Sequence, residues 1–247
     1  MIESVCAVIF DFDGLLMDTE STSVASWERE WERWGLVLDR KAFFVPHGGD
    51  VTEHRYEVLA SAVGESFDRV ASHERRTADR DAMNVELVLA PGLSRWLEEA
   101  ADAGLRNAVA SSSDVAWVER HLRQADVLDC FDVIAGGDQV ETHKPAPDVY
   151  HLALSMLELD SSRAVAVEDT AHGIDAAHGA GLACIAIPNP FVSQGVVAHA
   201  ELVLGSAAEV SLTEALRQVS AARATANRLT SFGRGHEDER PSESGAL

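Results

Sequence analysis

The chain has 247 residues, and its 46% of hydrophobic and 25% of charged residues are the proportions of a globular protein. Its 41 acidic and 20 basic residues give a net charge of −21, which excludes nucleic acid and anionic membranes as natural partners. No apolar run approaches the roughly 20 residues that span a bilayer, and the acidic start lacks the positive charge of a signal peptide. We therefore expect a cytoplasmic protein in which any anion-binding site has its own cation.

The first predicted element is a buried strand over residues 5–10, a short apolar run that ends in Asp-Phe-Asp-Gly. Similar runs return later in the chain and alternate with helical patterns. Strands are predicted at 107–110, 133–135, 164–167, 183–187 and 201–204, and helices near 93–103, 114–125, 147–157, 170–180 and 207–224. This alternation predicts an α/β fold with a doubly wound, Rossmann-like parallel sheet. Such sheets bind ligands at the carboxyl ends of their strands.

Residues 18–90 interrupt this alternation and contain no convincing strand. Helical patterns are present at 20–34, 52–63 and 66–84. One face of the first pattern carries Val24, Trp27, Trp31 and Trp34, which predicts the core of a small helical unit. The expected domains are a core of 1–17 and 91–225, an inserted α-helical cap of 18–90 and a disordered tail of 226–247.

Two carboxylates directly follow the first predicted strand. Asp11 and Asp13 are two residues apart, and Gly14 permits a sharp turn after them. A carboxylate at the end of a buried strand is costly unless it binds a cation or takes part in chemistry. Because an acidic pair beside a glycine is also ordinary turn chemistry, this motif alone leaves both interpretations open.

Hydroxyl groups follow the predicted strand over 107–110. Ser111, Ser112 and Ser113 lie at the expected start of a helix. Hydroxyl and backbone N–H groups in this position bind phosphate oxygens well. They also serve as ordinary helix caps, so the serines by themselves do not distinguish a phosphate site from capping.

A lysine and a second acidic pair complete the set of polar groups at strand ends. Lys144 lies in a segment stiffened by prolines just before a predicted helix, and it supplies the cation that the acidic chain needs. Glu168 and Asp169 follow the strand over 164–167. Their hard carboxylate oxygens suit an octahedral Mg²⁺ site.

These four motifs, in this order, resemble those of the haloacid dehalogenase (HAD) superfamily, in its β-phosphoglucomutase and phosphoglycolate phosphatase branch. The resemblance covers about residues 5–190. The motifs are Asp11-Phe12-Asp13-Gly14, the Ser111 cluster, Lys144-Pro145-Ala146-Pro147-Asp148, and Glu168-Asp169 followed by Gly173-Ile174. The resemblance implies a HAD core with an inserted helical cap and the chemistry of phosphoryl transfer.

The resemblance also implies a role for each matching residue. Asp11 would be the nucleophile that forms an aspartyl phosphate, and Asp13 would protonate the leaving oxygen and then activate water. Ser111, Ser112 and Lys144 would hold the phosphoryl oxygens. The implied enzyme is a phosphatase whose partner is a small, sugar phosphate-like metabolite, and we take it to be a monomer by default.

A Mg²⁺ cofactor follows from the same resemblance. Asp11, the backbone carbonyl of Asp13 and the side chain of Asp169 would bind the ion, and Glu168 would bind it directly or through water. The cation would neutralise charge between the nucleophile and the phosphate, which otherwise repel each other as two anions.

Three other activities are alternatives to a phosphatase. A β-phosphoglucomutase would carry a histidine on the first cap helix, where this chain has Ser23, and an arginine soon after a cap-loop glycine, where Arg55 comes late. A 2-haloacid dehalogenase needs neither a metal nor a second carboxylate such as Asp13. A protein that only binds a phosphorylated metabolite has no need of an acid at Asp13.

The expected substrate-specifying loop lies in the cap. It contains His47, Gly48 and Gly49, and its glycines allow the backbone to approach a ligand closely. His47 either contacts substrate or is a solvated loop histidine. We therefore assign these residues to substrate choice and not to catalysis.

Overall fold

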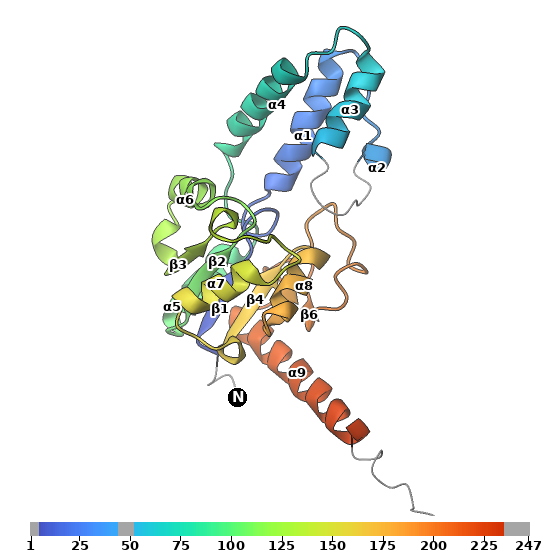
Figure 1. The fold of residues 1–247 in the computed structure, drawn as a ribbon. Coiled ribbons are helices and arrows are strands. Elements are labelled where there is room, and N and C mark those ends of the chain that lie inside the picture. Colours follow the sequence, from blue (N-terminus) through green and yellow to red (C-terminus); the bar gives the residue numbers. More distant parts are fainter. Residues whose placement is uncertain (1–4, 44–51, 235–247) are drawn as a thin grey trace, which may run out of the picture.

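The computed structural model describes residues 5–43 and 52–234, and these contain a six-stranded sheet (Figure 1). The strands are parallel and lie in the order β3-β2-β1-β4-β5-β6, which is a doubly wound arrangement. Their bounds are β1 Ala7–Phe10, β2 Arg106–Ala110, β3 Val133–Ala135, β4 Ala164–Glu168, β5 Ala183–Ala186 and β6 Leu202–Val203. The predicted α/β fold is confirmed.

The register of the strands brings the ends of β1, β2 and β4 to one level. Strand β1 lies between the other two, with Phe10 opposite Val109 on one side and Val167 on the other. The next residue, Asp11, still donates its N–H to the Val167 carbonyl at 2.9 Å. Side chains that follow these three strands therefore share one edge of the sheet, at the point where the strand order reverses.

Helices cover both faces of the sheet. They are α5 Leu93–Asp102, α6 Val115–Gln124, α7 Asp148–Met156, α8 Ala171–Gly179 and α9 Leu212–Arg234, with short 3₁₀ helices at Leu128–Cys130, Gly137–Gln139 and Ser161–Arg163. In β1, Val8 and Phe10 pack on the face covered by α5, α6 and α9, whereas Ala7 and Ile9 pack on the face covered by α7 and α8. All four side chains are fully buried, as expected for a parallel sheet between two helical layers.

The last helix, α9, differs from the prediction at both ends. It begins at Leu212, later than the predicted 207, because Ser211 caps it by accepting a hydrogen bond from the Glu214 N–H at 3.2 Å. It continues to Arg234, beyond the predicted end at 224. Residues 226–234 of the predicted disordered tail are therefore helical, and the rest of that tail lies outside the described residues.

Between β1 and α5, the described residues form a helical insertion that stands beyond the carboxyl edge of the sheet (Figure 1). Its helices are α1 Thr19–Arg33, α2 Arg40–Phe43, α3 Thr52–Val63 and α4 Arg69–Asn84. Helices α1 and α4 pack along each other, and the rings of Trp27 and Tyr56 lie 4.6 Å apart. These two rings and Leu59 form a small core with Trp31 and Trp34 at its margin, so the predicted tryptophan-rich face is a core face.

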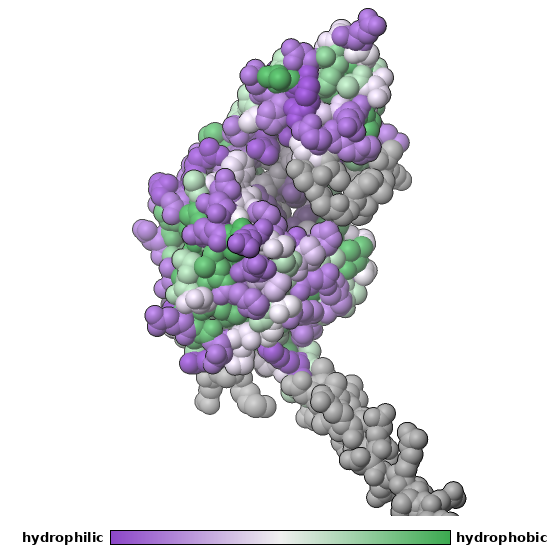
Figure 2. All heavy atoms as spheres, viewed as in Figure 1, coloured by the Kyte–Doolittle hydropathy of each residue, from purple (hydrophilic) through white to green (hydrophobic). Residues whose placement is uncertain are grey.

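The two segments that join the insertion to the sheet pair with each other. Met17 forms an antiparallel bridge with Leu89, and the Ala90 N–H donates to the Leu16 carbonyl at 2.9 Å. These contacts lie at the predicted boundaries between core and cap, and the division into two domains stays a prediction. Figure 2 shows that the visible face of the insertion is mainly hydrophilic. Among the described helices, none has the length and apolar character needed to cross a membrane.

A buried charge joins α1 to α4. Glu30 is fully buried, and its carboxylate accepts hydrogen bonds from Arg75 at 2.6 Å, Arg33 at 3.1 Å and the Trp34 Nε1–H at 3.3 Å. Burial alone would raise the pKa of Glu30, but the hydrogen bonds, first among them that from Arg75, lower the pKa below its ordinary value. The ionised carboxylate therefore stabilises the insertion at neutral pH.

We expect Glu30→Gln to lower the free energy of unfolding by about 1–3 kcal/mol, because it removes the buried counter-charge of two partly exposed arginines. The advantage of the wild type should be complete above the unfolded pKa of about 4.3 and should fade as the pH falls through the lower folded pKa. Urea unfolding at neutral and acidic pH measures both effects.

The matched control is Glu28→Gln, which lies on the same helix as Glu30 and breaks the exposed ion pair with Arg40 of α2. That change should cost at most about 1 kcal/mol, because exposed pairs are weak. Equal losses for the two variants would contradict the role given to Glu30.

Candidate active site

Three carboxylates meet at the carboxyl edge of the sheet. Asp11 follows β1, Glu168 ends β4 and Asp169 comes directly after it. One oxygen of each lies within 4.8 Å of the others, and the three residues are only 7%, 0% and 2% exposed. Carboxylates buried this closely together need cations among them. The structure thus brings together these three of the predicted metal ligands.

Lys144 lies within this cluster. The segment before α7 carries it to the sheet edge, where Nζ donates to Asp11 Oδ1 at 2.5 Å, to Glu168 Oε1 at 2.6 Å and to the Ala110 carbonyl at 2.8 Å. The Tyr150 hydroxyl donates to the same Glu168 oxygen at 2.7 Å. Because an ammonium has three hydrogens to donate, these contacts fix the lysine completely.

The cluster is short of positive charge. Three carboxylates and one ammonium leave a formal charge of −2 in a buried site. Burial raises the pKa of Asp11 to about 8, although Lys144 lies beside it, and burial with the charge of Asp11 raises the pKa of Asp169 well above its usual range. Burial lowers the pKa of Lys144, but the neighbouring carboxylates raise it more, so the lysine stays charged. An all-oxygen donor set with this charge fits a divalent cation such as Mg²⁺.

Two glycines make room for the acidic pair. Gly14 has a φ of +86°, and a Cβ there would lie 2.3 Å from Asp169 Oδ2. Gly173, in the first turn of α8, lies so close to Glu168 that a Cβ would be 1.9 Å from the carboxyl carbon. Neither distance is compatible with a side chain, which explains why glycine occupies both positions of the motifs.

Asp13 is not one of the three clustered carboxylates, and its side chain lies among hydrogen-bond donors. Its carboxylate accepts hydrogen bonds from the Ser113 hydroxyl at 2.7 Å and the Thr19 hydroxyl at 2.9 Å. The Trp117 Nε1–H and the Ser111 hydroxyl donate to it at 3.2 and 3.4 Å. Thr19 is the first residue of α1, so the insertion contributes directly to the position of Asp13.

The two serines predicted to bind phosphate differ in burial. Ser111 is buried at the end of β2, and its hydroxyl oxygen also accepts the Ser113 N–H at 3.0 Å. Ser112 is exposed, and its side chain makes no hydrogen bond among the residues that the structure describes. The neighbouring Ser113, which the phosphate assignment omitted, supplies the second hydroxyl near Asp13 instead.

Sequence reasoning also missed three other side chains that contact the site. In the sequence, Tyr150 of α7 and Trp117 of α6 are indistinguishable from the apolar residues by which a helix packs against a core. Asn189, which donates to Asp169 Oδ2 at 2.7 Å, lies between two prolines after β5. A polar residue held by prolines beyond a strand end was the one signal available for Asn189.

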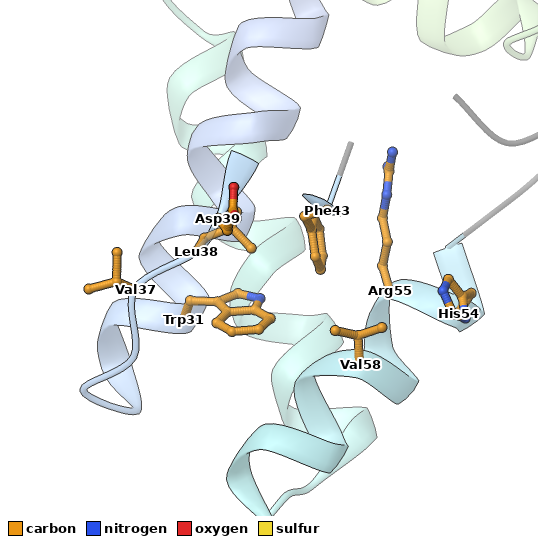
Figure 3. Close-up of a pocket in the computed structure, with 8 residues that line it drawn as sticks. All are labelled: Trp31, Val37, Leu38, Asp39, Phe43, His54, Arg55 and Val58. Carbon is orange, nitrogen blue, oxygen red and sulfur yellow. The ribbon is translucent and has the colours of Figure 1, made fainter. Parts of the chain in front are cut away.

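The predicted substrate loop, His47, Gly48 and Gly49, lies outside the described residues. Beside it in the chain, the insertion has a pocket of about 200 Å³ (Figure 3). The pocket is lined by Trp31, Val37, Leu38, Asp39, Phe43, His54, Arg55 and Val58. Because none of the predicted catalytic or metal-binding residues lines it, the carboxyl edge of the sheet is the candidate active site.

Comparisons with known proteins show the family of the chain. The sequence model of the family described as "Haloacid dehalogenase-like hydrolase" matches residues 8–187. YhcW of Bacillus subtilis (strain 168), whose name describes it as a candidate phosphatase, is 35% identical over 83% of this chain and 94% of its own. The phosphorylated carbohydrates phosphatase of Thermotoga maritima is 31% identical over 71% of this chain and 82% of its own.

Among solved structures, CbbY from Rhodobacter sphaeroides is similar in both sequence and fold. A mutant of that protein in complex with xylulose-(1,5)bisphosphate is 32% identical, with a TM-score of 0.67 over 85% of this chain and 98% of that one. The family match includes all four motifs, from Asp11 after β1 to Asp169 after β4. The chain is therefore an enzyme of the haloacid dehalogenase-like hydrolase family.

Proposed function

We propose that this enzyme is a Mg²⁺-dependent phosphatase that hydrolyses a small, sugar phosphate-like metabolite through an aspartyl phosphate on Asp11. The observation that carries the proposal is the buried cluster in which Lys144 bridges Asp11 and Glu168, so that three carboxylates share a single ammonium group. A purely structural ion pair would be neutral. Phosphoryl transfer instead needs an anionic nucleophile beside a cation that binds both it and the substrate.

In the proposed reaction, a carboxylate oxygen of Asp11 attacks phosphorus, and the bond from phosphorus to the leaving oxygen breaks. Water then attacks the aspartyl phosphate, which releases inorganic phosphate and restores Asp11. Lys144 holds one Asp11 oxygen at 2.5 Å and places its charge where the phosphoryl group would lie. The buried Ser111 hydroxyl, at the end of the neighbouring strand, would bind a phosphoryl oxygen. No side-chain contact supports the same role for Ser112.

Asp13 is proposed to move the protons of both steps. It gives a proton to the leaving oxygen in the first step and takes one from the attacking water in the second. The donors around it, Ser113, Thr19 and Trp117, hold the carboxylate in one orientation.

The metal ligands we propose are Asp11, Asp169 and the backbone carbonyl of Asp13, with Glu168 in support. Bound there, Mg²⁺ would offset the negative charge of the cluster and polarise the phosphoryl group. Both Glu168 oxygens already accept hydrogen bonds, Oε1 from Lys144 and Tyr150 and Oε2 from the Asp169 N–H at 3.1 Å. These contacts favour an interaction of Glu168 with the ion through water.

The substrate class rests on the relatives. The Thermotoga maritima relative is named for phosphorylated carbohydrates, and the CbbY structure contains a sugar bisphosphate. A phosphosugar mutase is the alternative, but Ser23 of α1 offers a hydroxyl where the mutase pattern has an imidazole. Hydrolysis by water is therefore the activity we assign.

We expect phosphate release from sugar phosphates to require Mg²⁺ and to disappear in Asp11→Asn, because an amide is a poor nucleophile. A panel of small phosphorylated metabolites, assayed with Mg²⁺ and after chelation, measures both requirements. Asp175→Asn, on the exposed side of α8, is the matched control and should keep full activity. Substantial activity in Asp11→Asn would refute the covalent mechanism. Isomer formation without phosphate release would indicate the mutase, and halide release without metal would indicate a dehalogenase.

Asp13→Asn should slow turnover by about 10²–10⁴-fold, because it removes the general acid and base while keeping the size of the side chain. Rapid-quench measurements of aspartyl phosphate formation and breakdown should show that both steps are slowed. Thermal unfolding should change little, since an amide oxygen still accepts from the surrounding donors. Turnover at the wild-type rate would remove Asp13 from the chemistry.

A further inference from the structure

We propose that Asn189 is a positioning residue that fixes Asp169 for the metal ion. The inference rests on the proposed function, because it concerns the Mg²⁺ site of that function. Asn189 is contributed by the segment after β5, on the side of β4 away from Asp11. It is only 7% exposed, and its Nδ2 donates to Asp169 Oδ2 at 2.7 Å.

The amide of Asn189 is held in one orientation. Its Oδ1 accepts the Phe191 N–H at 2.9 Å, and its backbone carbonyl accepts the Val192 N–H at 3.0 Å. Rotating the amide by half a turn would place Oδ1 against the Asp169 carboxylate and the NH₂ group against the Phe191 N–H. Both contacts would then be repulsive, so the NH₂ group must face Asp169.

Asp169 Oδ2 is also confined from the other side. A Cβ on Gly14 would lie 2.3 Å from this oxygen and 3.2 Å from Asn189 Nδ2, so the backbone at Gly14 packs against the same contact. Oδ2 thus lies between the Gly14 backbone and the Asn189 amide. This leaves Oδ1 as the carboxylate oxygen that we assign to the ion.

Fixing Asp169 has a cost that Asn189 offsets. One oxygen of each of two further carboxylates lies within 4.8 Å of Asp169, and their repulsion disfavours the ionised Asp169 side chain in this position. A neutral amide donor holds it in place without adding charge and without competing for the ion. Partners of this kind typically change metal affinity by about 10- to 100-fold when they are removed.

The test is Mg²⁺ binding by isothermal titration calorimetry to the full chain, without substrate. We expect Asn189→Ala to bind Mg²⁺ about 10- to 100-fold more weakly than the wild type. Asn189 borders a cavity of about 350 Å³, so truncation enlarges an existing space and the variant should fold. Asn189→Leu keeps the branched shape in a slightly larger side chain without the amide, and it should show the same loss.

The matched control is Asn107→Ala. Asn107 is a similarly buried asparagine, 4% exposed, whose Nδ2 donates to the Cys130 carbonyl at 3.1 Å near the start of β2. Its variant should bind Mg²⁺ as the wild type does. An equal loss in Asn107→Ala would attribute the effect to general destabilisation and overturn the inference.

Turnover gives a second readout. In Asn189→Ala, the Mg²⁺ concentration for half-maximal activity should rise by the same factor, while kcat at saturating Mg²⁺ should stay close to that of the wild type. If the wild type binds Mg²⁺ and both Asn189 variants bind it with the same affinity, the inference about Asn189 is overturned and the proposed function is not. A wild type that binds no Mg²⁺ would overturn the proposed function and the inference with it.

Discussion

The ammonium group of Lys144 is the interaction on which the arrangement of the site depends. It bonds to residues at the ends of three neighbouring strands: Asp11 after β1, the Ala110 carbonyl of β2 and Glu168 of β4. Without it, three carboxylates would be buried together with no positive charge, which a protein interior does not tolerate. The lysine therefore stabilises the acidic edge of the sheet, and the carboxylates that it leaves without a counter-charge are the ligands of the proposed metal ion.

Much of this edge could be predicted from the sequence, because parallel strands end at one level. Once the alternation of strands and helices is recognised, Asp11, Ser111 and Glu168 must come close to one another. The need for a cation in a chain of net charge −21 points to Lys144, the lysine beside the prolines. The helical insertion and its tryptophan face followed from periodicity alone. The assignment of roles to these residues remains a prediction.

Other parts of the site were out of reach of such reasoning. After β2 the chain turns into α6, and the strand alternation no longer determines which serine faces inward, so Ser113 and not Ser112 reaches Asp13. Trp117 and Tyr150 lie on helices, where an aromatic residue is predicted to pack in the hydrophobic core. Their polar atoms find partners only through the tertiary fold. For α9, the pattern of apolar residues begins before Ser211, so it predicted too early a start. The helix begins after Ser211 because this residue caps it.

The pairing of Met17 with Leu89 has a consequence for how such a molecule can diversify. The chain leaves the core and returns to it at neighbouring residues, so the helices that follow Thr19 can lengthen, shorten or change fold without moving a strand of the sheet. The acidic edge and its lysine belong to the part that stays constant. The parts of the insertion that do not contact Asp13 can therefore vary, while the strand ends that carry the acidic residues and the lysine keep their positions.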